Sequence, residues 1–185
     1  MLKQEVHGSA FVNPEAVLTE IGLAYGSTVA DLGCGGGYFV IPAAHMVGEE
    51  GTVYAVDVLK AALSAVASKA QLYNLTNIRT VWSNVEVPGG ARKIRDHSVD
   101  TVLLVQLLSQ SAKHADIFRE VVRILSGRGH VVVIDWKRSD AEYMPDTEKI
   151  VSSADVERLA AHTGLRLVQR IDAGTHHYGL LFGRK

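Results

Sequence analysis

The sequence predicts an α/β domain built on a doubly wound, seven-stranded and mostly parallel sheet whose last strand runs antiparallel. Short apolar runs typical of buried strands alternate with segments whose apolar residues recur three and four positions apart, as on one face of a helix. A glycine-dense turn follows the first run, which is typical of sites where a strand leads through a turn into a helix beside a bound ligand. The last two runs are joined only by Asp172-Ala173-Gly174-Thr175, which is too short for a parallel crossover. Together these observations favour a layered α/β domain that ends in an antiparallel hairpin.

The expected elements follow one another along the chain. Asn13-Pro14-Glu15 indicates a helix start, because an N-cap residue, a proline at the first helical position and an early acid occur together. Seven apolar runs predict strands, at 28–32, 52–57, 78–82, 96–105, 130–135, 165–171 and 177–182. Periodic segments predict helices from about 38 to 47, 59 to 73 and 112 to 125, and a further helix between a capping-box start at Ser152 and a stop at Gly164. This gives five strand-then-helix units and a hairpin.

Length and composition predict one compact domain over residues 1–185, in which residues 1–25 form an N-terminal lead and a helix. The chain has 185 residues, of which 47% are hydrophobic and 21% charged, as is ordinary for an α/β protein. No repeat, low-complexity tract or linker divides it. The oligomeric state is not fixed by the sequence, and a homodimer is one open alternative.

Charge and residue usage exclude several functional classes. With 19 Lys and Arg against 20 Asp and Glu, the chain lacks the basic surplus with which proteins grip nucleic acid. No window reaches the roughly 18 consecutive apolar residues of a membrane span. A single cysteine and eight histidines without paired spacing predict no bound metal. We therefore expect a cytoplasmic protein that acts on a small molecule.

The turn after the first strand is the most informative segment. Glycines let the main chain pass close to a ligand, and the following helix directs its free N–H groups at whatever occupies the turn. The dinucleotide fingerprint expects a third glycine where Tyr38 stands. The ligand should therefore be small, polar and partly anionic, and a nicotinamide dinucleotide fits the spacing poorly.

The segment Asp31-Leu32-Gly33-Cys34-Gly35-Gly36-Gly37 resembles the first motif of the class I S-adenosylmethionine-dependent methyltransferases. That resemblance implies S-adenosylmethionine as the cofactor, with Asp31 fixing the amino end of its methionine moiety. It also implies that the glycine turn lies beneath this moiety. Within the turn, Cys34 is expected to be a small apolar filler and not a nucleophile.

The second strand ends in Asp57, where a carboxylate about 20 residues past a glycine turn can accept hydrogen bonds from both ribose hydroxyls. Dehydrogenases share this device, so Asp57 indicates a nucleoside without saying which one. We expect its carboxylate to serve the ribose and not the core.

Later segments extend the resemblance over most of the chain. Many of these methyltransferases carry an aspartate where Asn84 stands, and the amide oxygen of Asn84 can accept the same bond from the adenine amino group. The segment from Phe118 to Asp135 resembles the family's helix, turn and strand, with Gly127-Arg128-Gly129 as the turn. In the family, a seventh strand lies antiparallel between the fifth and sixth, as the predicted hairpin requires. The resemblance thus implies a Rossmann-like methyltransferase fold with cofactor contacts from Asp31, Gly33, Cys34, Gly35, Gly37, Tyr38, Asp57, Val58, Ser83, Asn84, Val85 and Gln106.

The methyl acceptor can be narrowed only by exclusion. Val105-Gln106-Leu107-Leu108 replaces the signature of enzymes that methylate amino groups of nucleic acids, and one cysteine cannot supply the several used in arsenite methylation. The motifs look most like the ubiquinone/menaquinone-biosynthesis type and its small-molecule relatives. No catalytic residue is indicated, because methyl transfer from a sulfonium depends mainly on in-line positioning.

Ligands of open α/β sheets bind beyond the carboxyl ends of the strands. The N-terminal lead and the polar link after the fifth strand are therefore the places to look for an acceptor pocket. Polar aromatic residues that could line it are His7, Tyr143, His176, His177 and Tyr178. Two rival functions stay open: a nicotinamide-dependent oxidoreductase, and a non-catalytic module that keeps the fold and binds the cofactor.

Overall fold

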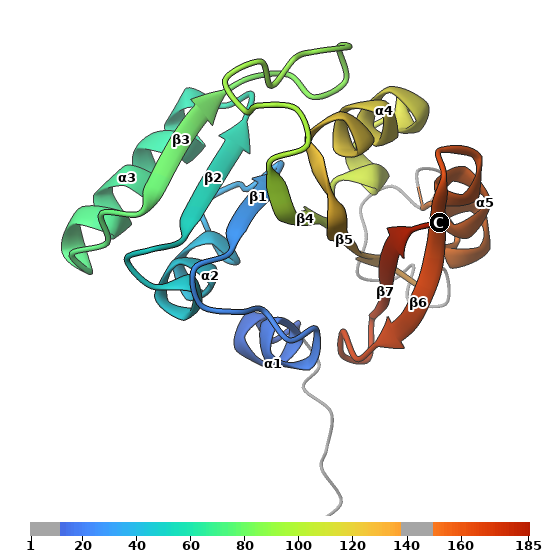
Figure 1. The fold of residues 1–185 in the computed structure, drawn as a ribbon, viewed down its shortest axis with the longest axis horizontal. Helices are drawn as coiled ribbons and strands as arrows, with labels where there is room; N and C mark the ends of the chain where they lie inside the picture. Colours follow the sequence, from blue (N-terminus) through green and yellow to red (C-terminus); the bar gives the residue numbers. More distant parts are fainter. Residues whose placement is uncertain (1–11, 138–149) are drawn as a thin grey trace, which may run out of the picture.

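The computed structural model describes residues 12–137 and 150–185, which form a seven-stranded sheet with helices on both faces (Figure 1). The strands lie in the order β3-β2-β1-β4-β5-β7-β6. Their bounds are β1 Thr28–Leu32, β2 Thr52–Asp57, β3 Ile78–Trp82, β4 Val99–Val105, β5 Leu125–Trp136, β6 Leu165–Ile171 and β7 His177–Arg184. β7 pairs antiparallel with both β5 and β6, and the other pairings in the described sheet are parallel. The predicted fold class and the position of the last strand are confirmed.

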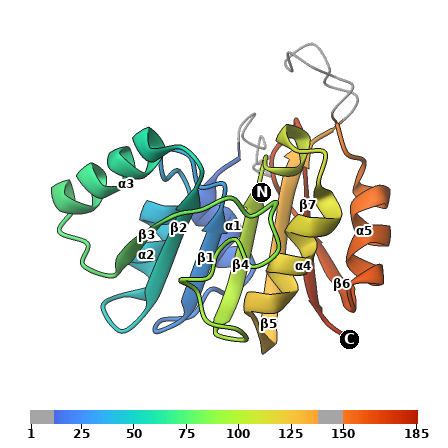
Figure 2. The same ribbon diagram turned by 90° about the horizontal axis from the view of Figure 1, so that it is seen from above.

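The helices divide between the two faces of the sheet (Figure 2). Their bounds are α1 Pro14–Glu20, α2 Val40–Val47, α3 Lys60–Leu72, the 3₁₀ helix η1 Leu108–Gln110, α4 His114–Ile124 and α5 Ser153–His162. Alternate residues of a strand point to opposite faces. Val29 of β1 therefore belongs to the core shared with α1, α2 and α3, whereas Ala30 belongs to the core shared with α4 and α5. Among the described helices, none has both the length and the apolar character needed to cross a membrane.

Two predicted helix starts are confirmed by their caps. The Asn13 side chain accepts a hydrogen bond from the Ala16 N–H at 3.0 Å, with Pro14 as the first helical residue. Ser152 accepts one from the Asp155 N–H at 3.2 Å. Both bonds satisfy N–H groups that a helix start leaves without an internal partner.

Three local expectations are corrected. α2 begins at Val40 instead of Tyr38, because the turn that starts at the glycines continues through Phe39. The expected turn Gly127-Arg128-Gly129 lies inside β5, where the register slips between the pairs Val99 with Leu125 and Thr101 with His130. The segment therefore forms a bulge in a longer strand.

The third strand-then-helix unit lacks its helix, because residues 83–98 cross from β3 to β4 as a series of turns. Pro88, Gly89 and Gly90 interrupt any helix there. Buried Glu120 of α4 holds this crossover by accepting the N–H groups of Gly89 and Ala91 at 3.1 and 2.9 Å. Burial alone would raise the pKa of Glu120, but hydrogen bonds from Arg123 and the main chain bring it below its usual value. The crossover is thus fixed beside the carboxyl end of β3.

Candidate functional site

The predicted site residues gather at the carboxyl ends of β1, β2 and β4, around two adjoining hollows that we call the strand-end cleft. The hollows share Gly33, Gly35 and Gln110. The Asp31 half, about 220 Å³, is further lined by Val12, Asp31, Cys34, Gly36, Tyr38, Phe39, Val105 and Gln106. The Asp57 half, about 320 Å³, is further lined by Val56, Asp57, Val58, Leu59, Ser83, Asn84, Val85, Glu86 and Leu107. Of the predicted contacts, only Gly37 lines neither half.

The glycine turn forms the floor that joins the two halves. Gly33, Gly35 and Gly37 have φ values of +77°, +49° and +83°, which side-chain-bearing residues rarely adopt. A Cβ at Gly33 would lie 2.8 Å from Leu107 Cδ1, and one at Gly37 would lie 2.9 Å from Val66 Cγ2. A Cβ at Gly35 would meet nothing within 4 Å. Gly33 and Gly37 therefore allow close packing, while Gly35 faces the open cleft.

Asp31 stands near the end of β1 with its side chain almost fully buried. No hydrogen bond within the described residues reaches its carboxylate. Burial, with a contribution from the negative charge of Asp57, raises the pKa of Asp31 to about 7. A buried carboxylate in this situation is stabilised by a cation, and the charged amino end of a ligand is suitable.

Asp57 at the end of β2 is held quite differently. One carboxylate oxygen accepts the Gly35 N–H at 2.9 Å and the other accepts the Leu59 N–H at 2.8 Å. The expectation that this carboxylate does not support the structure is therefore wrong, because it ties the glycine turn to the start of α3. Each oxygen keeps a further lone pair for a hydroxyl group in the cleft.

The thiol of Cys34 is unsuited to nucleophilic chemistry. It is buried, and burial together with the charges of Asp31 and Asp57 raises its pKa far above the usual value. A thiol that stays protonated neither attacks nor binds metal. As expected from the sequence, Cys34 fills space in the turn. The described residues also contain no group of three His, Cys, Asp or Glu side chains able to hold a metal ion.

The outer wall of the Asp57 half has both apolar and polar groups. Val58 and Leu59 are 52% and 63% exposed, which leaves an apolar surface at the mouth of the cleft. The Ser83 hydroxyl is buried without a hydrogen-bond partner among the described residues. Asn84 Oδ1 already accepts the Glu86 N–H at 2.8 Å, which leaves one lone pair on that oxygen. An apolar shelf beside unpaired polar atoms fits a nucleoside.

Gln110 is a wall residue that sequence reasoning missed. It ends η1, borders both halves, and its Nε2 donates to the Gln106 carbonyl oxygen at 2.6 Å. The only available signal was its position five residues after the end of β4, which does not by itself predict the 3₁₀ turn. Leu59 and Leu107 were also missed as lining residues.

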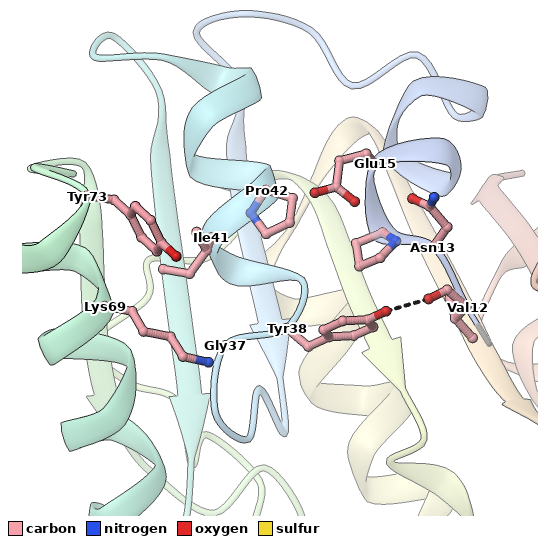
Figure 3. A pocket seen from close by; sticks show the side chains of 10 residues that line it. Val12, Asn13, Glu15, Gly37, Tyr38, Ile41, Pro42, Lys69 and Tyr73 are labelled. Atoms are coloured by element: carbon pink, nitrogen blue, oxygen red, sulfur yellow. Dashed lines mark hydrogen bonds between the residues drawn. The ribbon is translucent and has the colours of Figure 1, made fainter.

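Tyr38 lines both the Asp31 half and a neighbouring cavity of about 370 Å³. Figure 3 shows this second cavity, which lies between α1, α2 and α3. The Tyr38 hydroxyl donates to the Val12 carbonyl oxygen at 2.6 Å, and both residues line both cavities. On the other side of that cavity, Lys69 Nζ donates to the Gly36 carbonyl oxygen at 2.7 Å. The glycine turn is therefore held from α3 as well as from β2.

Of the residues suggested for an acceptor pocket, His7 and Tyr143 lie outside the described residues. His177 is brought to the cleft, since its Nε2 lies 2.8 Å from Gln106 Nε2. Tyr178 is directed elsewhere, because its hydroxyl donates to Val151 O at 2.8 Å. His176 is half-buried, and its carbonyl oxygen accepts the Lys137 N–H at 2.9 Å.

Residues 23–172 match a family described as a methyltransferase domain. That match covers most of the chain. The chain belongs to this methyltransferase family. The fold, the glycine turn and the two strand-end carboxylates agree with its class I members, which use S-adenosylmethionine.

Individual relatives agree with the assignment. The domain is 30% identical over 102 residues to the aklanonic acid methyltransferase DauC of Streptomyces sp. (strain C5), a match that covers 54% of this chain and 46% of DauC. The chain thus matches less than half the length of that relative. A SAM-dependent methyltransferase from Aquifex aeolicus superposes with a TM-score of 0.85 at 26% identity, covering 95% of this chain and 92% of that one. Geranyl diphosphate C-methyltransferase from Streptomyces coelicolor, solved with S-adenosyl-L-homocysteine, shares the fold at 18% identity and a TM-score of 0.72, covering 92% of this chain and 78% of that one.

Proposed function

We propose that this domain binds S-adenosylmethionine in the strand-end cleft and transfers its methyl group to a small-molecule acceptor. The observation that carries the proposal is the pair of carboxylates on adjacent strands, Asp31 and Asp57, with the open floor at Gly35 between them. Asp31 would bind the amino end of the methionine moiety and Asp57 the ribose hydroxyls. Asn84 would accept the adenine amino group beside the apolar shelf of Val58 and Leu59.

The cofactor supplies a methyl group that is already activated by its sulfonium centre. The residues of this chain then have to hold cofactor and acceptor in line and keep water out, which can provide much of the rate enhancement. A general base is needed only if the acceptor must lose a proton.

Two observations support a small organic acceptor. The name of DauC specifies aklanonic acid, and the Streptomyces coelicolor neighbour was solved with geranyl diphosphate. In this chain, the Asp31 half of the cleft reaches the carboxyl end of β4, where buried His177 of β7 contacts the wall residue Gln106. We place the acceptor there.

Calorimetry with S-adenosylhomocysteine and with NADH separates this proposal from an oxidoreductase. Micromolar binding of the first ligand and no heat from the second is the expected result. A methyl-transfer screen over phenolic and carboxylic small molecules, with S-adenosylhomocysteine formation as the signal, then separates an enzyme from a binding module. Binding without turnover on any acceptor would favour the module.

A cytoplasmic location, a single domain over residues 1–185, a homodimeric state and the absence of a nucleic-acid partner stay predictions from the sequence. Sedimentation equilibrium tests the oligomeric state, since a dimer has twice the mass of 20.0 kDa.

A further inference from the structure

The wall between Asp31 and the acceptor region is built around Gln106, which follows β4 and has a φ of +52°. Such a φ is costly for a residue with a side chain and persists only where neighbouring contacts fix it. The Gln106 N–H donates to Ile134 O at 2.7 Å, and the Gln106 carbonyl oxygen accepts from Gln110 at 2.6 Å. Both backbone polar groups of Gln106 are therefore held in place.

The segment that carries Gln110 is held in turn by Asp135 of β5. This buried carboxylate accepts the Ser109 N–H at 3.1 Å and the Trp136 N–H at 2.9 Å. The wall thus has a rigid backbone, and the remaining freedom of Gln106 lies in its side chain.

That side chain meets His177, the first residue of β7. Because β7 runs antiparallel beside β5, its first residue lies at the same edge of the sheet as the end of β4. His177 is 2% exposed, and its ring packs at a tilt against Trp136, with ring centroids 4.2 Å apart and planes 41° apart. Its Nε2 lies 2.8 Å from Gln106 Nε2.

The placement of the Gln106 amide nitrogen against the ring determines the role of each group. An amide nitrogen is only a donor, so in this arrangement His177 Nε2 is the acceptor and the ring carries its proton on Nδ1. The carboxamide of Gln106 has its nitrogen committed to His177. The group that Gln106 can offer to the cleft is then its oxygen, on the same wall as the Asp31 carboxylate.

We propose that His177 is a positioning residue of the cleft: it accepts the Gln106 amide and thereby orients the carboxamide so that its oxygen faces the ligand. This inference rests on the proposed function, because it assigns the oriented oxygen to the cationic methionine end of the cofactor. With the opposite orientation, the amide N–H groups of Gln106 would face that cation, to which they offer no acceptor. The pair therefore adds an oriented acceptor to the wall that also carries Asp31.

The first test is the tautomer of His177, read from long-range ¹H–¹⁵N spectra of the wild-type protein. We expect a protonated Nδ1 and an unprotonated Nε2. In Gln106→Glu the carboxylate cannot donate, so the Nε2 of His177 should become protonated. A wild-type ring protonated on Nε2 would overturn the proposal, because Gln106 would then present its nitrogen to the cleft.

The second test is S-adenosylhomocysteine affinity in a double-mutant cycle of His177→Phe and Gln106→Leu. His177→Phe keeps a ring against Trp136 and should weaken binding about tenfold, as expected for loss of one oriented hydrogen-bond acceptor. Once Gln106→Leu is present, His177→Phe should have no further effect. His130→Phe, the same change at an exposed position in the middle of β5, should bind like the wild type.

The outcomes separate the two proposals. Wild-type protein that fails to bind S-adenosylhomocysteine contradicts the proposed function. Wild-type binding with unchanged affinity in His177→Phe, or additive effects of the two substitutions, contradicts only the positioning role. If His177→Phe does not fold, the tautomers of the wild type and of Gln106→Glu still decide the question.

Discussion

Each half of the strand-end cleft contains one buried aspartate carboxylate, yet the protein holds the two carboxylates in different ways. Asp57 has both oxygens on main-chain N–H groups. Asp31 receives no hydrogen bond within the described part of the chain, and its pKa is raised to about 7 by burial and by Asp57. One carboxylate is satisfied by the protein, whereas the other requires a partner.

The two carboxylates are therefore suited to recognise different features of a ligand: Asp57 the direction of its hydroxyl groups, and Asp31 its positive charge. Because the main chain fixes Asp57, its free lone pairs have set directions, which suits a pair of hydroxyl groups. Asp31 gains most from a ligand cation, because that cation removes the cost of a buried negative charge. A cofactor with a ribose at one end and an ammonium at the other matches both halves.

Gly35→Val should have the largest effect, because Gly35 forms the floor that both halves share. Its φ of +49° disfavours a branched side chain, and the added atoms would occupy the open cleft. We expect S-adenosylhomocysteine binding to fall by at least about a hundredfold, since a ligand must be displaced from its main-chain contact.

Gly127→Val is the matched control. A Cβ at Gly127 also meets nothing within 4 Å, and this glycine lies outside the positive-φ region, in the bulge of β5. Calorimetry should show wild-type affinity for this variant. If Gly35→Val also binds normally, the glycine turn is not the floor of the cofactor site.

Asp57→Ala should weaken S-adenosylhomocysteine binding about ten- to a hundredfold, the range for charge-assisted hydrogen bonds to hydroxyls. It should also lower the free energy of unfolding by about 1–3 kcal/mol, because the N–H groups of Gly35 and Leu59 lose their acceptor. Calorimetry and urea unfolding measure the two effects. A variant with normal stability and weak binding would show that the carboxylate serves the ligand alone.

Asp57 illustrates which features of the fold and site can be predicted from the sequence. Strand bounds such as Thr52–Asp57 and Ile78–Trp82 were predicted without error, because buried parallel strands are apolar runs with sharp ends. The antiparallel hairpin followed from linker length. The position of Asp57 at the site was predictable for the same reason: it ends a strand beside the glycine turn.

The contacts between distant segments were not predictable. Nothing in the local sequence indicates that Gly35 donates to Asp57, that Gln110 closes the cleft, or that His177 reaches Gln106 across β5. These contacts depend on strand order and register, which the spacing of apolar residues does not specify. Pro88, Gly89 and Gly90 argue against a helix after β3, although the regular alternation of strands and helices elsewhere in the chain predicts one there.

A pH series should distinguish the Asp31 half from the Asp57 half. With a pKa of about 7, Asp31 is largely protonated at pH 6 and cannot pair with a ligand ammonium. Affinity for S-adenosylhomocysteine should therefore rise about tenfold between pH 5.5 and 7.0, below the pKa of about 7.7–8.0 of an α-amino group. Asp31→Asn should bind weakly and lose the pH dependence. Isothermal titration at five pH values measures both effects.

The raised pKa of Asp31 also determines how this group changes the folding stability with pH. The pKa of Asp31 is higher in the folded protein than its ordinary value of 3.8, so folding favours the protonated form. This group's contribution to stability is therefore present at acidic pH and is lost as pH rises to about 7. At pH 8, Asp31→Asn should raise the melting temperature of the ligand-free protein, opposite to Asp57→Ala. A lower melting temperature for Asp31→Asn would contradict the assignment of an uncompensated charge.

The smallest expected effect concerns Asn84, at the outer end of the Asp57 half. Its Oδ1 already accepts the Glu86 N–H, so one lone pair remains for the adenine amino group. Asn84→Asp keeps that acceptor and adds charge, and should bind S-adenosylhomocysteine as well as the wild type or a few-fold more tightly. Asn84→Leu loses the acceptor and should bind a few-fold more weakly.

A base analogue tests this contact without altering the protein. S-inosylhomocysteine presents an acceptor where adenine presents a donor, so its oxygen would face Asn84 Oδ1 without a proton between them. The wild type should therefore prefer the adenosyl ligand about tenfold, as expected when a hydrogen bond is lost and two acceptors are apposed. In Asn84→Leu the preference should shrink, because the apolar side chain distinguishes the two bases poorly. Equal affinities in the wild type would show that the base is held by the apolar shelf of Val58 and Leu59 and not read by Asn84.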